Sequence, residues 1–461
     1  MTDLHVPENE INEQLDICRE INALHLNKAY CIVTLGCQMN VRDSETLAGL
    51  MTQMGFHETS SREEADIIIY NTCCVRENAE NKALGNVIWL KELKKNKPDL
   101  IIGVCGCMMQ QEGMSGNLKG KYPFIDFVFG THNAYKFPEY LKRVLLDGER
   151  VFEVWDVNGY VPEGLPAKRG SKLNAFVNIM YGCNNFCTYC IVPYVRGRER
   201  SRDAEDILAE CKSLKEQGAK EIMLLGQNVN SYMGGGSAFA ELIKRVNDLG
   251  IERIRFMTSH PKDITRELME CFASCEHLMP ALHLPVQCGS NEVLKAMNRR
   301  YTREHYFELI DKLRSIRPDI GLTSDIIVGF PGETRAQFEE TLDLVKRVLY
   351  DAAYTFIYSP RVGTIAAKMD DPVSMEEKTE RIEELIALQQ SITSETLQSL
   401  VGTTQEVLVE TVSTRSDRTV GGKTPRGHMV NFDGCEKLIG QTVKVKITES
   451  GKNTLKGVLE D

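Results

Sequence analysis

The chain has 461 residues, of which 42% are hydrophobic and 26% charged, and its formal net charge is −10. This composition is that of a folded globular protein, and no apolar run reaches the ~18 residues that a membrane span needs. The first 27 residues are polar without a signal-peptide pattern, so fifteen cysteines indicate metal chemistry in a reducing compartment rather than disulfides. We expect about three domains, a cytoplasmic location and no membrane partner. The acidic balance argues mildly against indiscriminate nucleic-acid binding.

After a polar N-terminal extension over residues 1–27, residues 28–146 alternate apolar segments with amphipathic helical ones. The expected strands cover 29–37, 65–73, 100–107 and 124–130. Continuous apolar strands separated by helices are typical of a parallel sheet that is covered on both faces. We therefore predict an α/β domain with a flavodoxin-like, doubly wound sheet.

A cysteine stands at the end of three of these strands, at Cys37, Cys73 and Cys107. The carboxyl ends of parallel strands meet at one edge of a sheet, where such folds build their sites. Three thiols would converge there, and soft sulfur ligands suit iron–sulfur sites. The alternative, small buried hydrophobic residues, fits one cysteine better than three strand ends. The neighbouring Cys74 and Cys105 are expected to pack in the core.

Gly, Pro and mixed charge indicate a linker over residues 147–172, and residues 173–399 then repeat a strand-plus-helix unit six times. The expected strands cover 175–183, 221–227, 253–260, 281–287, 322–330 and 352–359. Repeated right-handed βα units curl a parallel sheet toward a barrel. We predict an open (β/α)6 partial TIM barrel, because six units leave one side open, and this opening suits a large substrate.

The loop after the first of these strands carries Cys183, Cys187 and Cys190, with the spacing Cys-x3-Cys-x2-Cys. Three thiolates can hold three corners of a cubic cluster and leave the fourth iron open to a ligand. The alternatives are a disulfide pair and a zinc site, but zinc would need a fourth Cys or His, and none follows closely. Three further cysteines in helical stretches are expected in the core: Cys211, Cys271 and Cys275.

These cysteine patterns resemble known families. The pattern Cys-x3-Cys-x-aromatic-Cys, with Tyr189 as the aromatic residue, resembles the signature of the radical S-adenosylmethionine (SAM) enzymes. Three N-terminal segments resemble the cysteine motifs of the methylthiotransferases: Gly36-Cys-Gln-Met-Asn40, Asn71-Thr-Cys73 with Val75-Arg76-Glu77, and Gly106-Cys107. The resemblance implies two [4Fe–4S] clusters, a radical SAM cluster on the second cysteine group and an auxiliary cluster on Cys37, Cys73 and Cys107.

The same resemblance implies a SAM site at the carboxyl ends of the barrel strands. The segment Gly226, Gln227 and Asn228 resembles the one that receives the methionine amino group. Three further candidates are a ribose contact, the start of a segment like the family's strand beside the adenine, and an aromatic neighbour of that base: Gln287, Asp325 and Tyr189. Glycines and amides at strand ends also make ordinary turns. No catalytic side chain beyond the clusters is predicted.

Four arginines follow the second cysteine group and are opposed only by Glu199: Arg196, Arg198, Arg200 and Arg202. Such a run is usually a solvated face. Beside a reactive site, however, the guanidinium fork suits phosphate oxygens. Arg196 and Arg198 are therefore candidate RNA contacts.

A predicted helix over 374–400 leads into a β-rich end, residues 400–461. Its expected strands, which suit a small barrel, cover 404–412, 428–432, 442–448 and 454–459. This end resembles the TRAM domain, which binds tRNA in the methylthiotransferase family; a capping or assembly role is the alternative. Three of its side chains are candidate RNA contacts: Lys423, Arg426 and His428.

Val430-Asn431-Phe432 resembles the tRNA branch of the methylthiotransferases. That branch implies a methylthio group added to C2 of N6-isopentenyladenosine in the tRNA anticodon loop, with one SAM for the radical and a second for methylation of sulfur. The expected partners are tRNA, an electron donor such as flavodoxin or ferredoxin, and a sulfur source, and we expect a monomer. The rivals are a methylthiotransferase for a ribosomal-protein aspartate, one for threonylcarbamoyl-adenosine, and an iron–sulfur RNA-binding regulator without turnover.

Overall fold

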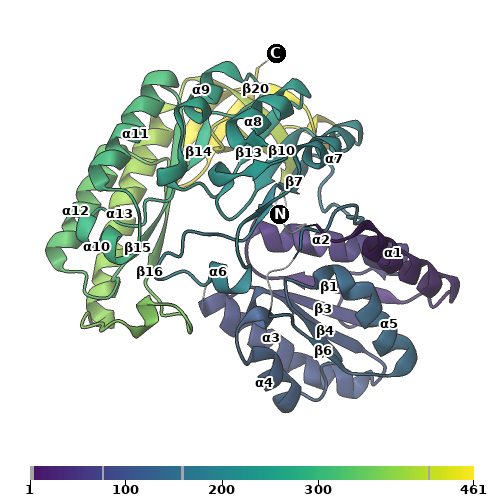
Figure 1. Ribbon diagram of the computed structural model, residues 1–461. Helices are drawn as coiled ribbons and strands as arrows, with labels where there is room; N and C mark the ends of the chain where they lie inside the picture. The colour runs from purple at the N-terminus through teal and green to yellow at the C-terminus, as the bar shows by residue number, and fades with distance from the viewer. Residues whose placement is uncertain (1–4, 75–76, 157–159, 414–415, 461) are drawn as a thin grey trace.

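The computed structural model describes residues 5–74, 77–156, 160–413 and 416–460, with the backbone alone at 77–84 and 417. Val75 and Arg76 of the predicted second cysteine motif therefore lie outside the described residues. Figure 1 shows an N-terminal sheet flanked by helices, a larger central half-barrel, and a C-terminal barrel packed against the latter. None of the helices in these ranges combines the length and the apolar character needed to cross a membrane.

The N-terminal sheet is parallel and six-stranded, in the order β2-β1-β3-β4-β5-β6. Its strands are β1 (Ala29–Thr34), β2 (His57–Glu58), β3 (Ile67–Thr72), β4 (Ile101–Gly106), β5 (Phe127–Phe129) and β6 (Val151–Glu153). The predicted flavodoxin-like sheet is confirmed, since its strand order begins 2-1-3-4-5. The prediction missed β2 and β6, and β6 falls inside the predicted linker, because two or three residues carry too little pattern.

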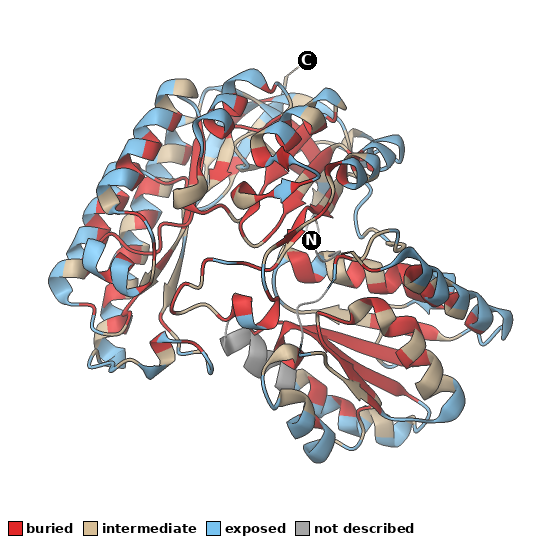
Figure 2. Ribbon diagram, in the orientation of Figure 1, coloured by how far each residue is buried: buried red, intermediate tan, exposed pale blue. Residues whose placement is uncertain are grey.

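Alternate residues of the central strands serve two hydrophobic cores. Ile67 and Ile69 face one core, whereas Ile68 and Tyr70 face the other. The first core is closed by α1 (Glu8–Ala23), α2 (Gln38–Gln53) and α5 (Phe137–Asp147), and the second by α3 (Glu77–Asn96) and α4 (Met114–Lys121). The strands are consequently buried on both sides, as Figure 2 shows in red.

The central domain is an open barrel of six parallel strands. They are β7 (Asn174–Asn178), β10 (Glu221–Leu225), β13 (Arg253–Phe256), β14 (Ala281–His283), β15 (Gly321–Val328) and β16 (Ala352–Ile357). Two three-stranded sheets, β13-β10-β7 and β14-β15-β16, are joined by a parallel bridge between Ile254 and Leu278. Within the described ranges β7 does not pair with β16, which confirms the predicted opening.

Helices cover the outside of this barrel and leave their exposed faces to solvent (Figure 2). They are α7 (Ala204–Glu216), α8 (Phe239–Asp248), α9 (Arg266–Ser274), α10 (Asn291–Ala296), α11 (Arg303–Ile316) and α12 (Arg335–Val348). Cys211, Cys271 and Cys275 are buried in the core between these helices and the strands, as predicted. Cys74 and Cys105 are likewise buried in the two N-terminal cores.

The predicted long helix is α13 (Met375–Ser399), whose N-cap Ser374 accepts a hydrogen bond from the amide of Glu377. It leads into a closed barrel in the order β17-β18-β19-β21-β20. Its strands are β17 (Thr404–Ser413), β18 (Ser416–Lys423), β19 (Met429–Asp433), β20 (Thr442–Ser450) and β21 (Leu455–Leu459). The prediction missed β18, because this polar segment contains Gly421 and Gly422, which sequence rules assign to turns.

Candidate functional site

Three of the predicted ligand cysteines come together at the carboxyl edge of the N-terminal sheet. Cys37 is the residue before α2, Cys73 follows β3, and Cys107 opens the 3-10 helix after β4. Gly36, with φ +126°, makes the approach possible, because a Cβ there would lie 2.5 Å from the Cβ of Cys73 and 3.1 Å from its sulfur. The loop of Cys37 thus rests directly against Cys73.

Asn40 links the three cysteine loops. Its amide nitrogen donates to the carbonyl of Leu35 at 3.1 Å and to that of Thr72 at 3.0 Å. Its side-chain oxygen lies 3.6 Å from the sulfur of Cys37 and 3.9 Å from that of Cys107. Asn40 lies in the first turn of α2 and is buried, so it positions the cysteines from within the helix.

The central domain contributes Arg196 to this same edge. Its Nε atom lies 3.1 Å from the sulfur of Cys107, and an Nη atom donates to the side-chain oxygen of Asn40 at 3.0 Å and to Asp43 at 2.7 Å. Arg196 is only 5% exposed. The expectation that it contacts RNA is therefore corrected: its charge is directed at the auxiliary cysteines, which sequence reasoning did not foresee.

The second predicted group lies in the loop between β8 (Met180–Tyr181) and α6 (Val192–Val195). Cys183 and Cys187 are buried and Cys190 is partly exposed. The loop is anchored at both ends: the amide of Cys183 donates to the carbonyl of Gly197 at 3.1 Å, and the amide of Thr188 donates to that of Met297 at 3.1 Å. These bonds fix where the three sulfurs stand.

Arg299 is the cationic neighbour of this second group. Its Nη1 atom lies 3.5 Å from the sulfur of Cys187, and the guanidinium also donates to the carbonyl of Pro285 at 2.7 Å and to the hydroxyl of Tyr301 at 2.9 Å. No sequence pattern singled out Arg299, because its sequence position gives no hint of its distant partners.

Burial acts strongly on the cysteine thiols of both groups. It raises the pKa of Cys107 to about 12, although the nearby Arg196 acts to lower it. Burial likewise raises the pKa of Cys183 to about 11 and that of Cys190 to about 12. Thiols in such surroundings stay protonated unless a metal binds the thiolate. The two arginines favour the anionic form that iron ligation requires.

The donor sets fit cubic iron–sulfur clusters. All fifteen cysteines lie in the described part of the chain, and none forms a disulfide. In the same ranges no group of three or more His, Cys, Asp or Glu side chains is close enough to hold a single metal ion. The sulfurs around a cubic cluster bind three different irons, so they stand farther apart than the ligands of one ion.

Three of the six predicted SAM residues, Tyr189, Gln287 and Asp325, border one cavity of about 860 Å³, and Cys190 of the second cysteine group forms part of its wall. The backbone amide of Gln287 donates to the backbone carbonyl of Asp325 at 2.9 Å, which links the segment after β14 to β15. The cavity wall also includes residues that were not predicted, among them Phe356, Tyr358 and Arg361.

The segment at the end of β10 does not line this cavity. The amide nitrogen of Asn228 donates to Asp263 at 2.7 Å, and that of Gln227 lies 2.5 Å from the sulfur of Met39. A Cβ on Gly226 would lie 2.5 Å from the side chain of Met180. In this structure Gln227 packs the top of the barrel against α2, whereas Gly226 and Asn228 contact other residues of the central domain, and none of the three borders the cavity.

Two of the three candidate RNA contacts of the C-terminal barrel, Arg426 and His428, face the central domain. Arg426 forms an ion pair with Asp351, and Nε2 of His428 lies 3.4 Å from the same carboxylate. Lys423 pairs with Glu410 at 3.0 Å. The expectation that Arg426 and His428 contact RNA is therefore corrected, because both hold the barrel onto the central domain. Arg198, by contrast, is exposed and lies 4.3 Å above the ring of Phe186.

Comparisons with known proteins agree with this architecture. The chain matches the Radical SAM superfamily over residues 177–345, the Uncharacterized protein family UPF0004 over 29–130 and the TRAM domain over 398–459. The radical S-adenosylmethionine methyltransferase TsrM from Kitasatospora setae shares the fold, with a TM-score of 0.53 at 13% identity over 74% of each chain.

Two curated relatives align with nearly the full length. The tRNA-2-methylthio-N(6)-dimethylallyladenosine synthase of Thermoanaerobacter sp. (strain X514) is 53% identical over 99% of this chain and 98% of its own. The enzyme of the same name from Clostridium botulinum (strain Alaska E43 / Type E3) is 51% identical over 97% and 99%. The chain therefore belongs to the tRNA-2-methylthio-N(6)-dimethylallyladenosine synthases, a family of radical SAM methylthiotransferases that use SAM and [4Fe–4S] clusters.

Proposed function

We propose that this chain adds a methylthio group to C2 of an N6-isopentenyladenosine beside the anticodon of tRNA, with one SAM used for radical generation and one for methylation. The main support is the short connection between the two cysteine groups. Helix α6 begins two residues after Cys190 and packs on the 3-10 helix that begins at Cys107. A base that enters beside α6 would meet both groups.

Each cysteine group has a distinct role in this proposal. Cys37, Cys73 and Cys107 hold the auxiliary cluster, and Cys183, Cys187 and Cys190 hold the cluster that binds SAM. When bound, the clusters and SAM supply the radical that activates the C–H bond and the methyl group for sulfur. The protein contributes position: Asn40 and Arg196 order the first group, whereas Arg299 orders the second.

Tyr189, Gln287 and Asp325 border the cavity that we assign to SAM. His283 lies 3.6 Å from Asp325 and limits where that carboxylate can turn. The base must leave its stack to reach this site, which is easier in a single-stranded loop than in a duplex. The open side of the barrel offers the entrance, and the C-terminal barrel is the RNA-holding module of the proposal.

The other expected partners stay predictions. They are an electron donor such as flavodoxin or ferredoxin and a sulfur source. The monomeric state and the cytoplasmic location are predictions too. The family relationship supports tRNA as the substrate but does not bear on these points.

The test is an anaerobic assay of the reconstituted chain on three substrates: isopentenylated tRNA, the same tRNA without the isopentenyl group, and the ribosomal protein. Mass spectrometry of digested products detects the methylthio group. We expect product on the isopentenylated tRNA. Little product is expected on unmodified tRNA, because without the apolar isopentenyl group its pocket would stay unfilled.

Product on the ribosomal protein alone would overturn the proposal, as would equal product on both tRNAs. A threonylcarbamoyl-adenosine tRNA serves as a further arm for the remaining methylthiotransferase rival. Release of deoxyadenosine from SAM under reduction separates any of these enzymes from a regulator without turnover.

A further inference from the structure

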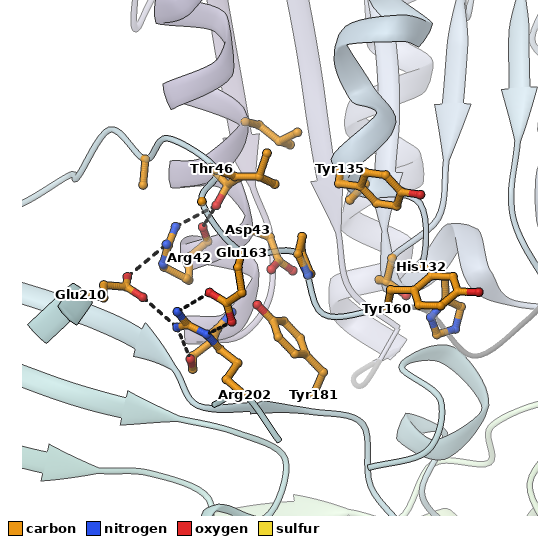
Figure 3. A pocket seen from close by; sticks show the side chains of 18 of the residues that line it. Arg42, Asp43, Thr46, His132, Tyr135, Tyr160, Glu163, Tyr181, Arg202 and Glu210 are labelled. Atoms are coloured by element: carbon orange, nitrogen blue, oxygen red, sulfur yellow. Dashed lines mark hydrogen bonds and ion pairs between the residues drawn. The ribbon is translucent and has the colours of Figure 1, made fainter. Parts of the chain in front are cut away.

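A second cavity, of about 400 Å³, is lined by residues of the N-terminal and central domains. Helices α2 and α7 and the segment 160–169 form much of its wall. Figure 3 shows Arg42, Glu210 and Arg202 joined on one side, with His132 and Tyr160 on the other. Apart from Arg196, the residues that line this cavity have no role in the reaction proposed above.

Five arginines line the cavity, and four of them have carboxylate partners within ion-pairing distance. The pairs are Arg42 with Glu210 at 3.2 Å, Arg169 with Glu45 at 2.8 Å, Arg196 with Asp43 at 2.7 Å, and Arg202 with Glu163 at 2.6 Å. The fifth is Arg200. Arg200 is therefore the one lining arginine without an ion pair among the described residues, and the remaining lining carboxylate, Asp206, is exposed and has no ion pair either.

Arg200 is only 5% exposed. Its guanidinium donates to the backbone carbonyls of Arg198 at 2.8 Å and Arg196 at 3.2 Å, and its Nε atom has no partner. Throughout the described ranges no carboxylate forms an ion pair with it. A buried cation without an opposite charge is costly, because it has lost the hydration that stabilised it in water.

Asn178 supplies a second unsatisfied group on the same lining. Its side chain is buried, at 4% exposure, and its amide oxygen has no hydrogen-bond partner. Buried polar atoms in native proteins normally have partners. The lining thus offers a small anionic ligand a charge partner in Arg200 and a hydrogen-bond acceptor in Asn178.

The cavity adjoins the auxiliary cysteines. Its wall includes Cys105 and Gly106, the two residues before Cys107. Arg196 also lines it and reaches the sulfur of Cys107 at 3.1 Å. The lining also includes the exposed Gly164, which places part of the cavity wall at the protein surface. A small ion in the chamber would therefore stand between the solvent and the auxiliary cluster.

We propose that this cavity binds a small monovalent anion that pairs with Arg200, and that the anion used in the reaction is hydrosulfide. Hydrosulfide carries one negative charge for Arg200 and one S–H group that can donate to the oxygen of Asn178. It also carries the element that the transfer consumes. Binding is noncovalent, so no bond forms or breaks at this step. The hydrosulfide assignment rests on the proposed function, whereas the anion site does not.

The first experiment locates the anion with bromide. Crystals of the full reconstituted chain are soaked in sodium bromide, and anomalous diffraction maps the bromide positions. We expect a peak within hydrogen-bond distance of the Arg200 guanidinium, retained in Arg200→Lys and absent in Arg200→Met. Wild-type crystals without a peak there overturn the anion site, whether or not either variant folds.

The second experiment tests hydrosulfide by kinetics. Methylthiolation of isopentenylated tRNA is measured against sodium hydrosulfide concentration, after iron content has shown that each variant is folded and loaded. Arg200→Met should raise the half-saturating concentration about tenfold, which corresponds to ~1.4 kcal/mol, and Arg200→Lys should recover part of this loss. The matched control is Arg245→Met. Arg245 lies on α8 and forms an ion pair with the exposed Glu205 of α7, so this variant should keep the wild-type value.

An unchanged hydrosulfide dependence in Arg200→Met overturns the hydrosulfide assignment even if bromide binds. Sulfur incorporated only from a persulfide on a carrier protein, and never from hydrosulfide, overturns it as well. A chain that modifies no tRNA at all refutes the proposed function instead, and the bromide experiment then still decides whether the cavity is an anion site.

Discussion

The Nε atom of Arg196 lies 3.1 Å from the sulfur of Cys107, although the two residues are 89 positions apart and belong to different domains. The contact makes the central domain part of the auxiliary cysteine site. Arg196 comes six residues after Cys190, the last cysteine of the barrel loop. A movement of that loop would therefore shift Arg196 relative to Cys107. The two cysteine groups are therefore linked by one short segment, from Cys190 to Arg196.

Removal of the auxiliary ligands should halve the iron content. The triple variant Cys37→Ala, Cys73→Ala and Cys107→Ala should fall from about eight to about four irons per chain after anaerobic reconstitution. Reductive SAM cleavage should persist, because the second group is built entirely by the barrel. The matched control is Cys74→Ala, a buried cysteine beside Cys73, which should keep all the iron. A folded triple variant without SAM cleavage would show that the roles are assigned wrongly.

Gly36→Ala should selectively damage the auxiliary site. The added Cβ would come within 2.5 Å of the Cβ of Cys73, at a φ of +126° that side chains rarely adopt. We expect iron to fall toward about four per chain. In Gly116→Ala the new methyl meets no atom within 4 Å, so iron should be unchanged. Equal iron in the two variants would contradict the packing argument.

Loss of the guanidinium at Arg196 should weaken the hold on the auxiliary cluster. In Arg196→Met the Cys107 thiolate loses its cationic neighbour, so a chelator should remove about four irons roughly tenfold faster than from wild type. Arg196→Lys should lie between the two. Arg198→Met, which removes an exposed arginine two positions away, serves as the control for iron release. A wild-type release rate in Arg196→Met would rule out this role.

Asp351 should make the docking of the C-terminal barrel pH-dependent. Burial acts to raise its pKa, but His428 and Arg426 outweigh burial and leave that pKa below its ordinary value. Such a carboxylate stabilises the fold above its unfolded pKa of about 3.9 and loses this contribution as pH falls through the folded pKa. Asp351→Asn should therefore cost about 2 kcal/mol at neutral pH and flatten the stability profile below about pH 4.

Thermal unfolding of the wild type and Asp351→Asn across pH measures this effect. The comparison variant is Asp343→Asn, whose carboxylate pairs with Arg303 but is 67% exposed, so it should change little. Parallel profiles for wild type and Asp351→Asn down to acid pH would show that the carboxylate does not carry the dependence.

The outer face of β20 should contact tRNA. Lys444 and Lys446 are exposed, and within the described ranges neither forms an ion pair with a carboxylate. The double variant Lys444→Gln and Lys446→Gln should weaken tRNA affinity and lower the slope of log affinity against log salt by about 0.7–0.9 per lost phosphate contact. Filter binding over a salt series measures both quantities, with Lys452→Gln, in the β20–β21 turn, as the control. An unaltered slope would assign the RNA contact elsewhere.

The sequence by itself determined the three-part architecture and the two sets of cysteines. The reason is that both signals are local: apolar strands alternate with helices, and each cysteine stands at a strand end or in one short loop. In a parallel sheet the ends of strands share an edge, so positions along the chain sufficed to bring Cys37, Cys73 and Cys107 together. The cores around Cys74 and Cys105 followed from the same pattern.

Only the tertiary structure decided what the charged residues do. Arg196, Arg426 and His428 read as RNA contacts because a cation in a sequence does not reveal whether it is buried. Their partners, Cys107 and Asp351, lie in other domains, and a charge is fixed by whatever stands within a few ångströms in space. The same holds for Arg200, whose lack of a carboxylate partner became visible only when two domains closed a cavity around it.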